Sequence, residues 1–317
     1  MQAVLALMAG AYRMSKRMVQ TFCGDVLGVP ICAGQVCACE AETAAAIEPV
    51  VQELREYVRG QPANVDETGW WQKRQRGWLW AVVTQAVTVF TIALSRAAAV
   101  AKELVDPAAG QVITTDRYKG YLWLPLRQRQ VCWAHLIRDF QAMVDRASAG
   151  SAVGEELLCC AEDLFTWWYR VRDSTMSRST FQRYIAELRP WVRSQLECGA
   201  ACACAKTAGT CREILAVEPA LWTFARVEGV EPTNNCGERA VRHGVIYRKL
   251  SGGTKSEAGS RFVERILTVH ATLRLQARPI LPFLRAACEA RLRRSAPPSL
   301  LPGPPVRRAL RPLPAAA

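Results

Sequence analysis

The chain has 317 residues, half of them hydrophobic, which predicts a folded protein of two domains or of one domain with a large insertion. Its 41 Lys and Arg outnumber 28 Asp and Glu, and the net charge of +13 favours nucleic acid as a partner, although anionic membrane surfaces attract the same residues. No run of about 18 uncharged apolar residues occurs, which excludes a membrane-spanning helix.

Residues 15 to 58 are predicted to form helices that are interrupted at Gly28-Val29-Pro30. Ser15 precedes the first helical pattern and has the chemistry of an N-cap. Two helices joined by a short Gly-containing turn are compatible with a helix-turn-helix DNA reader, and equally with a small helical bundle. We therefore expect a helix-turn-helix-like segment over residues 1–60, with Lys16 and Arg17 as candidate DNA contacts.

The next segment contains short runs rich in β-branched and aromatic residues, which predict strands. Residues 78–83 and 87–92 predict a hairpin, and residues 111–115 predict a further strand after the Ala-rich helix expected over 96–105. With residues 63–67 counted as the first strand, the order is strand, strand, strand, helix, strand. This order predicts an α/β domain with a mixed sheet.

Residues 135–225 have almost wholly helical periodicity, with two apolar stripes. The stripes consist of Leu157, Leu158, Leu164, Phe165, Trp168 and Val171, and of Phe181, Tyr184, Ile185 and Leu188. We interpret residues 141–231 as a helical insertion between two parts of one catalytic domain, 61–140 and 232–295. The composition of residues 296–317, rich in Pro, Arg and Ala, predicts a disordered tail.

Three acidic residues stand where functional groups gather. Asp66 and Asp116 each end a predicted strand, where an open sheet forms a crevice, although each could instead begin a turn or cap a helix. Glu238 lies on the first turn of a helix that begins near Asn235, so a capping box between these two residues is the alternative to a functional role. The same helix has a basic face, which can bind DNA phosphates or remain solvated, formed by Arg239, Arg242, Arg248 and Lys249.

The cysteine and histidine residues do not by themselves identify a site. The odd total of 13 cysteines argues against a disulfide framework and indicates a reducing compartment. The spacing of Cys198, Cys202, Cys204 and Cys211 does not reproduce a paired zinc pattern, so free thiols are expected. His135 and Asp139 lie one helical turn apart and are expected to share a face, either as a hydrogen-bonded pair near the acids or as a structural contact.

Four motifs together resemble transposases of the insertion sequence 66 (IS66) family, and the similarity runs from about Tyr12 to about Leu301. They occur in the family's order and are Asp66-Glu67-Thr68-Gly69-Trp70, Thr115-Asp116-Arg117-Tyr118, Cys132-Trp133-Ala134-His135-Leu136-Ile137-Arg138-Asp139-Phe140 and Asn234-Asn235-Cys236-Gly237-Glu238-Arg239. The resemblance implies a ribonuclease-H-like fold interrupted by a helical insertion. It also implies a metal-binding catalytic triad of Asp66, Asp116 and Glu238.

The activity that this resemblance implies is that of a DDE-type DNA transposase, which cleaves and transfers DNA strands with two Mg²⁺ or Mn²⁺ ions. Its expected partners are double-stranded DNA, as transposon ends and target, and further copies of itself assembled on DNA, in the bacterial cytoplasm at the nucleoid. Asp66 and Glu67 point to opposite faces of a strand, so only one can face the metals, and the resemblance selects Asp66.

The amino end departs from the family pattern, because members carry a leucine-rich helix and a cysteine zinc module before the segment with which this sequence starts. We therefore keep a second hypothesis, that of a catalytically silent, truncated remnant that still binds DNA. A ribonuclease-H-like nuclease unrelated to transposition is a third, and it would cleave DNA without joining it.

Overall fold

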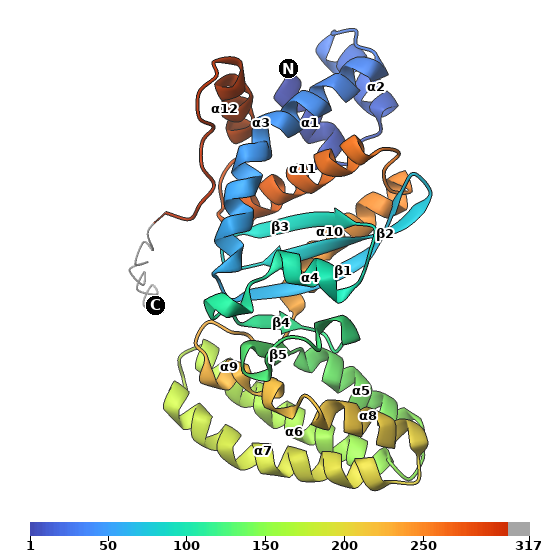
Figure 1. Ribbon diagram of the computed structural model, residues 1–317, viewed down its shortest axis with the longest axis vertical. Coiled ribbons are helices and arrows are strands. Elements are labelled where there is room, and N and C mark those ends of the chain that lie inside the picture. The colour runs from blue at the N-terminus through green and yellow to red at the C-terminus, as the bar shows by residue number, and fades with distance from the viewer. Residues whose placement is uncertain (304–317) are drawn as a thin grey trace, which may run out of the picture.

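A computed structural model describes residues 1–303, and in it a sheet lies between two groups of helices (Figure 1). The group beyond one edge of the sheet contains α1 (Gln2–Gly10), α2 (Lys16–Leu27), α3 (Ala33–Arg59), α11 (Glu257–Leu275) and α12 (Ile280–Leu292). The group beyond the other edge contains α5 (Trp133–Asp145), α6 (Ser151–Arg172), α7 (Arg178–Ala201), α8 (Ala205–Leu215) and α9 (Thr223–Arg226). Within this part of the chain, no helix has the length and hydrophobicity needed to cross a bilayer.

The sheet is mixed and has the strand order β3-β2-β1-β4-β5. Its strands are β1 (Ala63–Gln72), β2 (Gln75–Val83), β3 (Thr88–Ala93), β4 (Ile113–Thr115) and β5 (Arg129–Val131), with α4 (Ala98–Leu104) between β3 and β4. The first three strands pair in antiparallel fashion, whereas β4 runs parallel to both β1 and β5. The predicted α/β class and the order of three strands, helix and strand are confirmed; β5 was not expected, because a three-residue strand leaves almost no periodic signal.

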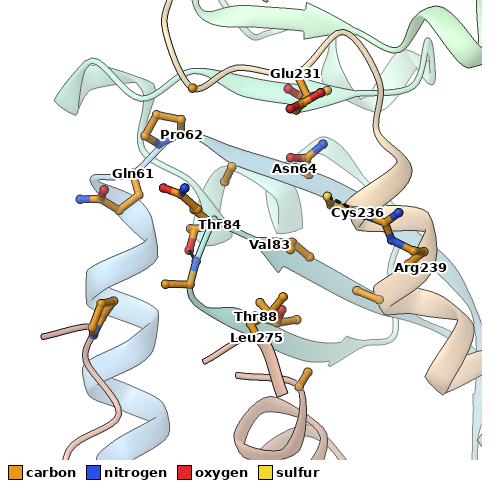
Figure 2. Close-up of a pocket in the computed structure, with 18 of the residues that line it drawn as sticks. Gln61, Pro62, Asn64, Val83, Thr84, Thr88, Glu231, Cys236, Arg239 and Leu275 are labelled. Atoms are coloured by element: carbon orange, nitrogen blue, oxygen red, sulfur yellow. Dashed lines mark hydrogen bonds between the residues drawn. The ribbon is translucent and has the colours of Figure 1, made fainter. Parts of the chain in front are cut away.

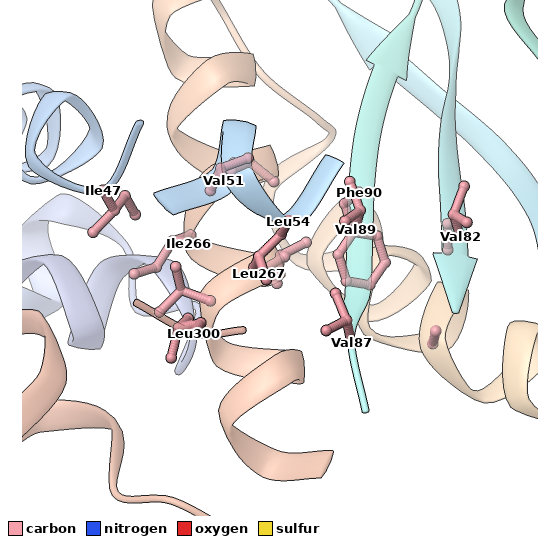
Figure 3. Packing of buried hydrophobic residues seen from close by; sticks show 14 of the residues in the cluster. Ile47, Val51, Leu54, Val82, Val87, Val89, Phe90, Ile266, Leu267 and Leu300 are labelled. Atoms are coloured by element: carbon pink, nitrogen blue, oxygen red, sulfur yellow. The ribbon is translucent and has the colours of Figure 1, made fainter. Parts of the chain in front are cut away.

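Helices α1 and α3 share a hydrophobic core with the sheet, whereas α2 packs on them through a separate small cluster that contains Val19 and Cys23. Ser15 caps α2 as expected, since its hydroxyl accepts a hydrogen bond from the amide of Met18 at 3.2 Å. Ile47 and Leu54 of α3 are fully buried and lie in one core with β3 and α11 (Figure 3). One face of α3 is therefore a layer of the main core, a packing that is compatible with both the helical bundle and the helix-turn-helix-like segment.

The edge strand β3 is closed by side chains of α11. The amides of Thr88 and Phe90 donate to the hydroxyls of Thr272 and Thr268, at 3.1 and 2.9 Å, and the amide of Ile92 donates to Glu264. Acceptors four residues apart on a helix are about 6 Å apart, close to the spacing of about 6.7 Å between alternate strand residues. The helix thus satisfies the backbone donors of an edge that would otherwise be open.

The helical insertion has a hydrophobic core of its own. Both predicted stripes contribute to it, through Leu157, Leu164 and Trp168 on α6 and through Phe181 and Ile185 on α7. This core also includes residues of β5 and α5, so the insertion packs as a unit that begins before residue 141.

A disordered tail was expected over residues 296–317, but its first residues are ordered. Leu300 is fully buried in the main core (Figure 3), and its carbonyl accepts a hydrogen bond from the side chain of Gln276 at 2.8 Å. Residues 296–303 therefore belong to the folded protein, because one apolar side chain anchors them. The rest of the predicted tail, 304–317, lies outside the described residues.

The contacts of β3 with α11 predict a stability difference between two threonines. Thr268→Val removes the acceptor of the Phe90 amide and leaves that donor buried, so we expect a loss of about 1–3 kcal/mol in urea unfolding. The matched control is Thr91→Val, because the buried hydroxyl of Thr91 has no partner within residues 1–303. The control should be neutral or slightly stabilising, and equal losses in the two variants would contradict the role of Thr268.

Candidate active site

Parallel pairing of β1 with β4 places the two predicted aspartates side by side. Asn64 of β1 is in register with Thr114 of β4, and two residues further along each chain lie Asp66 and Asp116. Asp66 is within β1, whereas Asp116 follows the end of β4, where one of its carboxylate oxygens accepts a hydrogen bond from the amide of Tyr118 at 2.9 Å. The turn role considered for Asp116 is therefore real, and it coexists with a position beside Asp66.

The loop of Asp116 is held by Arg129 of β5. The guanidinium of Arg129 is buried and donates to the main-chain carbonyl of Asp116 at 2.8 Å and to the hydroxyl of Thr115 at 3.1 Å. Burial lowers the pKa of Arg129 to about 10, still high enough to keep it charged at neutral pH. Arg129 was not recognised in the sequence, since a single Arg in a polar run carries no signal for this contact.

Glu238 follows the helical insertion in the chain and lies on α10 (Asn235–Ser251), which packs against β1 and β2. The start of α10 is anchored by Asn234, whose buried side chain donates to the carbonyl of Val65 at 2.9 Å and accepts from the side chain of Asn64 at 3.0 Å. The amide of Asn234 also donates to the sulfur of Cys132 at 3.1 Å. These bonds fix the first turn of α10 next to Asp66.

The capping box considered for Glu238 is not formed. Asn234 is the N-cap, so the third helical position is Gly237, and the side chain of Asn234 makes no cap hydrogen bond. Gly237 instead lies against the strand, where an added Cβ would be 3.1 Å from the Cβ of Asp66 and 2.8 Å from Oδ1 of Asn234. A glycine is therefore required for this close approach of helix and strand.

The three acids share one electrostatic environment. The pKa of Asp66 is raised to about 7, first by burial and then by the negative charges of Glu67 and Asp116; a backbone hydrogen bond opposes this shift by more than the charge of Glu238 adds to it. No basic residue of the described chain forms an ion pair with Asp66 or Asp116. Carboxylates collected in this way destabilise one another unless a proton or a cation is bound among them.

Glu67 has partners of its own. It forms an ion pair with Arg96 at 2.6 Å and accepts a hydrogen bond from the hydroxyl of Tyr121. The guanidinium of Arg96 in turn stacks over Tyr118 at 3.7 Å from the ring centre. The acid next to Asp66 is therefore paired within the protein itself, whereas Asp66 has no such partner among the described residues.

Glu238 also contacts α5. One of its oxygens accepts a hydrogen bond from Arg138 at 3.1 Å and lies 3.5 Å from Nδ1 of His135. The ligand atoms of Cys132, His135 and Glu238 all lie within 4.8 Å of one another, which makes them the tight metal-ligating group among residues 1–303. The three acids of the predicted triad do not form such a group, because the carboxylate of Glu238 is turned toward α5.

The expected pair of His135 and Asp139 is not formed. Asp139 instead accepts two hydrogen bonds from Arg117, at 2.6 and 3.0 Å, and so connects α5 to the loop that carries Asp116. His135 faces Glu238. The shared helix face therefore did not identify the partners, which come from two other segments: Arg117 lies 22 residues before Asp139, and Glu238 lies more than a hundred residues after His135.

The predicted DNA contacts differ in exposure and in distance from the acids. Lys16 forms an ion pair with Glu40 of α3, so its charge is already compensated, whereas Arg17 is exposed on α2. Arg239 and Arg242 are exposed on α10, while Arg248 and Lys249 lie on its last turn, distant from Glu238 along the helix.

A cavity of about 1130 Å³ is lined by Asn64, Thr114 and Cys236, each of which lies two residues before one of the three predicted acids in the chain. Figure 2 shows Asn64 on β1 together with Cys236 and Arg239 on α10 around this hollow. His270 also lines it, and burial lowers the pKa of His270 to about 4, so its imidazole is neutral at neutral pH. The triad residues do not line this cavity, which separates it from the candidate site.

Comparison with known families decides the family of the chain. The family described as "Transposase IS66 family" matches residues 10–261, from the end of α1 to the first turns of α11. The chain belongs to the IS66 family of transposases. A comparison with curated proteins finds no match. All four motifs that carry the resemblance lie within the matched residues of this IS66 transposase.

The raised pKa of Asp66 predicts a pH-dependent stability of the IS66 transposase. Its folded pKa of about 7 exceeds the ordinary 3.8, so the folded state holds the proton more tightly and loses stability as the pH rises between these values. In EDTA at pH 8, Asp66→Asn should therefore be more stable than the wild type by on the order of 2–4 kcal/mol in urea unfolding.

The advantage of Asp66→Asn should shrink below pH 7 and nearly vanish near pH 4. Asp145→Asn, on the exposed end of α5, is the control and should show no such trend. A constant difference between Asp66→Asn and wild type across this pH range would show that the carboxyl group is not strained by burial and by its acidic neighbours.

Proposed function

We propose that this IS66 family member is a DDE-type transposase in which Asp66, Asp116 and Glu238 bind the divalent cations that drive DNA strand cleavage and strand transfer. The single observation that carries the proposal is that acids from three distant parts of the sequence act on one buried carboxyl group: the pKa of Asp66 is raised first by burial and then by the charges of Glu67, Asp116 and, least, Glu238. The family match supports a DNA-processing enzyme.

The residues suit hard cations such as Mg²⁺ or Mn²⁺. Carboxylate oxygens are the ligands that these ions prefer, and a bound cation would reverse the mutual repulsion of the acids. The carboxylate of Glu238 has to turn from Arg138 toward Asp66 to complete the set, and several rotatable bonds permit this turn. Two such ions, when bound, activate the attacking oxygen and stabilise the departing oxygen of a phosphodiester.

The remaining parts of the fold have supporting roles in this proposal. A mixed sheet with acids on β1, after β4 and on α10 beyond a helical insertion fits a ribonuclease-H-like catalytic domain. Arg242, one helical turn after Glu238, is suited to hold phosphates of double-stranded DNA next to the acids, and Arg239, which also lines the neighbouring cavity, is a further candidate contact. We further propose that the protein acts as a homo-oligomer assembled on DNA.

The triad is tested with neutral substitutions of nearly the same shape. Asp66→Asn, Asp116→Asn and Glu238→Gln should each reduce Mn²⁺-dependent nicking of supercoiled plasmid at least about a hundredfold, because each removes an anionic ligand. The control is Glu257→Gln, which alters a first-turn acid of α11 as Glu238→Gln alters one of α10. Near wild-type nicking by any triad variant would remove that residue from the catalytic set.

Cation binding is tested independently of nicking. Mn²⁺ should raise the Tm of the wild type at pH 8, where the acids are ionised, and should raise that of Asp66→Asn much less. The same Mn²⁺ response in both proteins would place the cation elsewhere, for instance at Cys132, His135 and Glu238. A separate test looks for joined DNA products: a transposase forms them, whereas a nuclease only cleaves.

A further inference from the structure

Strand β1 and helix α10 run together from the candidate active site to the β1–β2 hairpin. At one end Gly237 of α10 faces Asp66, and at the other end Arg248 donates to the carbonyl of Gly69 and Tyr247 packs on Trp70 at 5.8 Å between ring centres. The hairpin and the end of α10 are therefore one structural unit, held in a fixed position relative to the acids.

A glycine pair connects α10 to the tip of the hairpin. Gly252 and Gly253 both adopt positive φ, and Gly253 lies so close to the strand that an added Cβ would be 2.1 Å from the carbonyl oxygen of Trp71. The chain then pairs with β1, because the amide of Thr254 donates to Trp71 at 2.8 Å and the amide of Lys73 donates to Thr254 at 3.0 Å. This pairing brings Lys255 beside the hairpin.

Six basic residues meet at this place, and we call them the tip cluster. Three come from the hairpin and three from the end of α10 and the segment after it: Lys73, Arg74, Arg76, Arg248, Lys249 and Lys255. Five of them are exposed and Arg248 is half-buried. Within residues 1–303 none forms an ion pair with an acid, in contrast to Lys16 or Arg96, so the tip cluster has an uncompensated positive charge.

Two of these basic residues occupy turn positions whose backbone conformation is unfavourable for Lys and Arg. Gln72 pairs with Gln75, so Lys73 and Arg74 form a two-residue turn, and both have positive φ, 49° and 67°. Such turns favour Asn and Gly, because a Cβ is unfavourable in the left-handed region. Two basic side chains in strained positions at an exposed tip indicate a binding role rather than a folding role.

We propose that the tip cluster is a second phosphate-binding surface of the protein, which holds duplex DNA at a fixed distance from the scissile bond. The inference rests on the proposed function for the position of the scissile bond, and the binding itself rests on the cluster alone. Arg and Lys side chains at a rigid, uncompensated surface are the groups that neutralise DNA phosphates.

The distance is set by the geometry of the two elements. Six residues of extended strand from Asp66 to Gln72 span about 20 Å, and the thirteen residues of α10 from Glu238 to Ser251 also span about 20 Å. At about 3.4 Å per base pair this length corresponds to about six base pairs. The tip cluster should therefore contact the backbone about six base pairs from the site of cleavage.

The test replaces the turn by the pair that such turns prefer, Lys73→Asn with Arg74→Gly. In EDTA, this double variant should bind a labelled random 30-base-pair duplex about tenfold more weakly than wild type at 0.1 M NaCl, and log Kd should depend on log salt with a slope about 1.8 smaller. Its Tm should be equal to or above that of wild type, because the strain in the turn is relieved.

The matched control removes two charges from the far side of the insertion, by Arg170→Gln with Arg172→Gln at the end of α6. The control should leave the affinity and the salt slope nearly unchanged. Wild-type affinity in the tip variant, or an equal loss in the control, would overturn the proposal, since general charge rather than this surface would then account for binding. Weaker binding accompanied by a lower Tm would also overturn it, because the turn would then serve folding.

The proposed distance is tested by mapping nicks on short linear duplexes in Mn²⁺. Wild type should place nicks no closer than about six base pairs from one end, and the tip variant should lose this limit. Nicks at all positions in both proteins would overturn the distance, with the catalytic proposal intact. Reduced binding by the tip variant, in a protein whose wild type never nicks, would instead support the surface and refute the proposed catalysis.

Discussion

The anchoring of α10 on β1 by Asn234 is the interaction on which the candidate site depends. The insertion separates β1 from α10 along the chain, so the position of Glu238 has to be restored by contacts between distant segments. Asn234 makes these contacts with buried hydrogen bonds to Val65 and Asn64, and loss of either leaves a buried amide group without a partner, at a cost of about 1–3 kcal/mol. Gly237 then allows the helix to approach Asp66 closely.

Two separate hydrophobic cores explain how the fold tolerates so large an insertion. The sheet shares one core with α1, α3 and α11, whereas α5 to α9 share another with β5. The main core is closed at the β3 edge by Thr268 and Thr272, whose hydroxyls accept hydrogen bonds from backbone amides that an open edge strand would expose. The site lies where the two units meet, which is why α5 contributes Arg138 and His135 to the surroundings of Glu238.

The molecule keeps like charges together at two places joined by the same pair of elements. At one end, burial and then neighbouring acids raise the pKa of Asp66 to about 7; at the other, Lys73 and Arg74 occupy left-handed positions that suit Gly and Asn. Both arrangements oppose folding, and both would become favourable with the ligands proposed for them, a cation at the acids and DNA phosphates at the tip. The packing of α10 on β1 keeps the acids and the tip cluster at a fixed distance from each other.

The sequence by itself determined the family, the mixed α/β class, the first four strands with the helix between the third and the fourth, and the helical character of residues 135–225, because local periodicity and motif order are properties of consecutive residues. It also marked Asp116 as a residue at a strand end, whereas Asp66, expected at such an end, lies within β1, which continues to Gln72. Only the tertiary structure decided that Asn234 anchors α10, that Glu238 faces Arg138, and that Asp139 binds Arg117 instead of His135. These partners are set by the packing of segments far apart in the chain, and neither hydrophobic spacing nor capping patterns contain that information. The burial of Leu300 was decided in the same way, since the composition of its segment predicts disorder while a single apolar contact with the main core orders it.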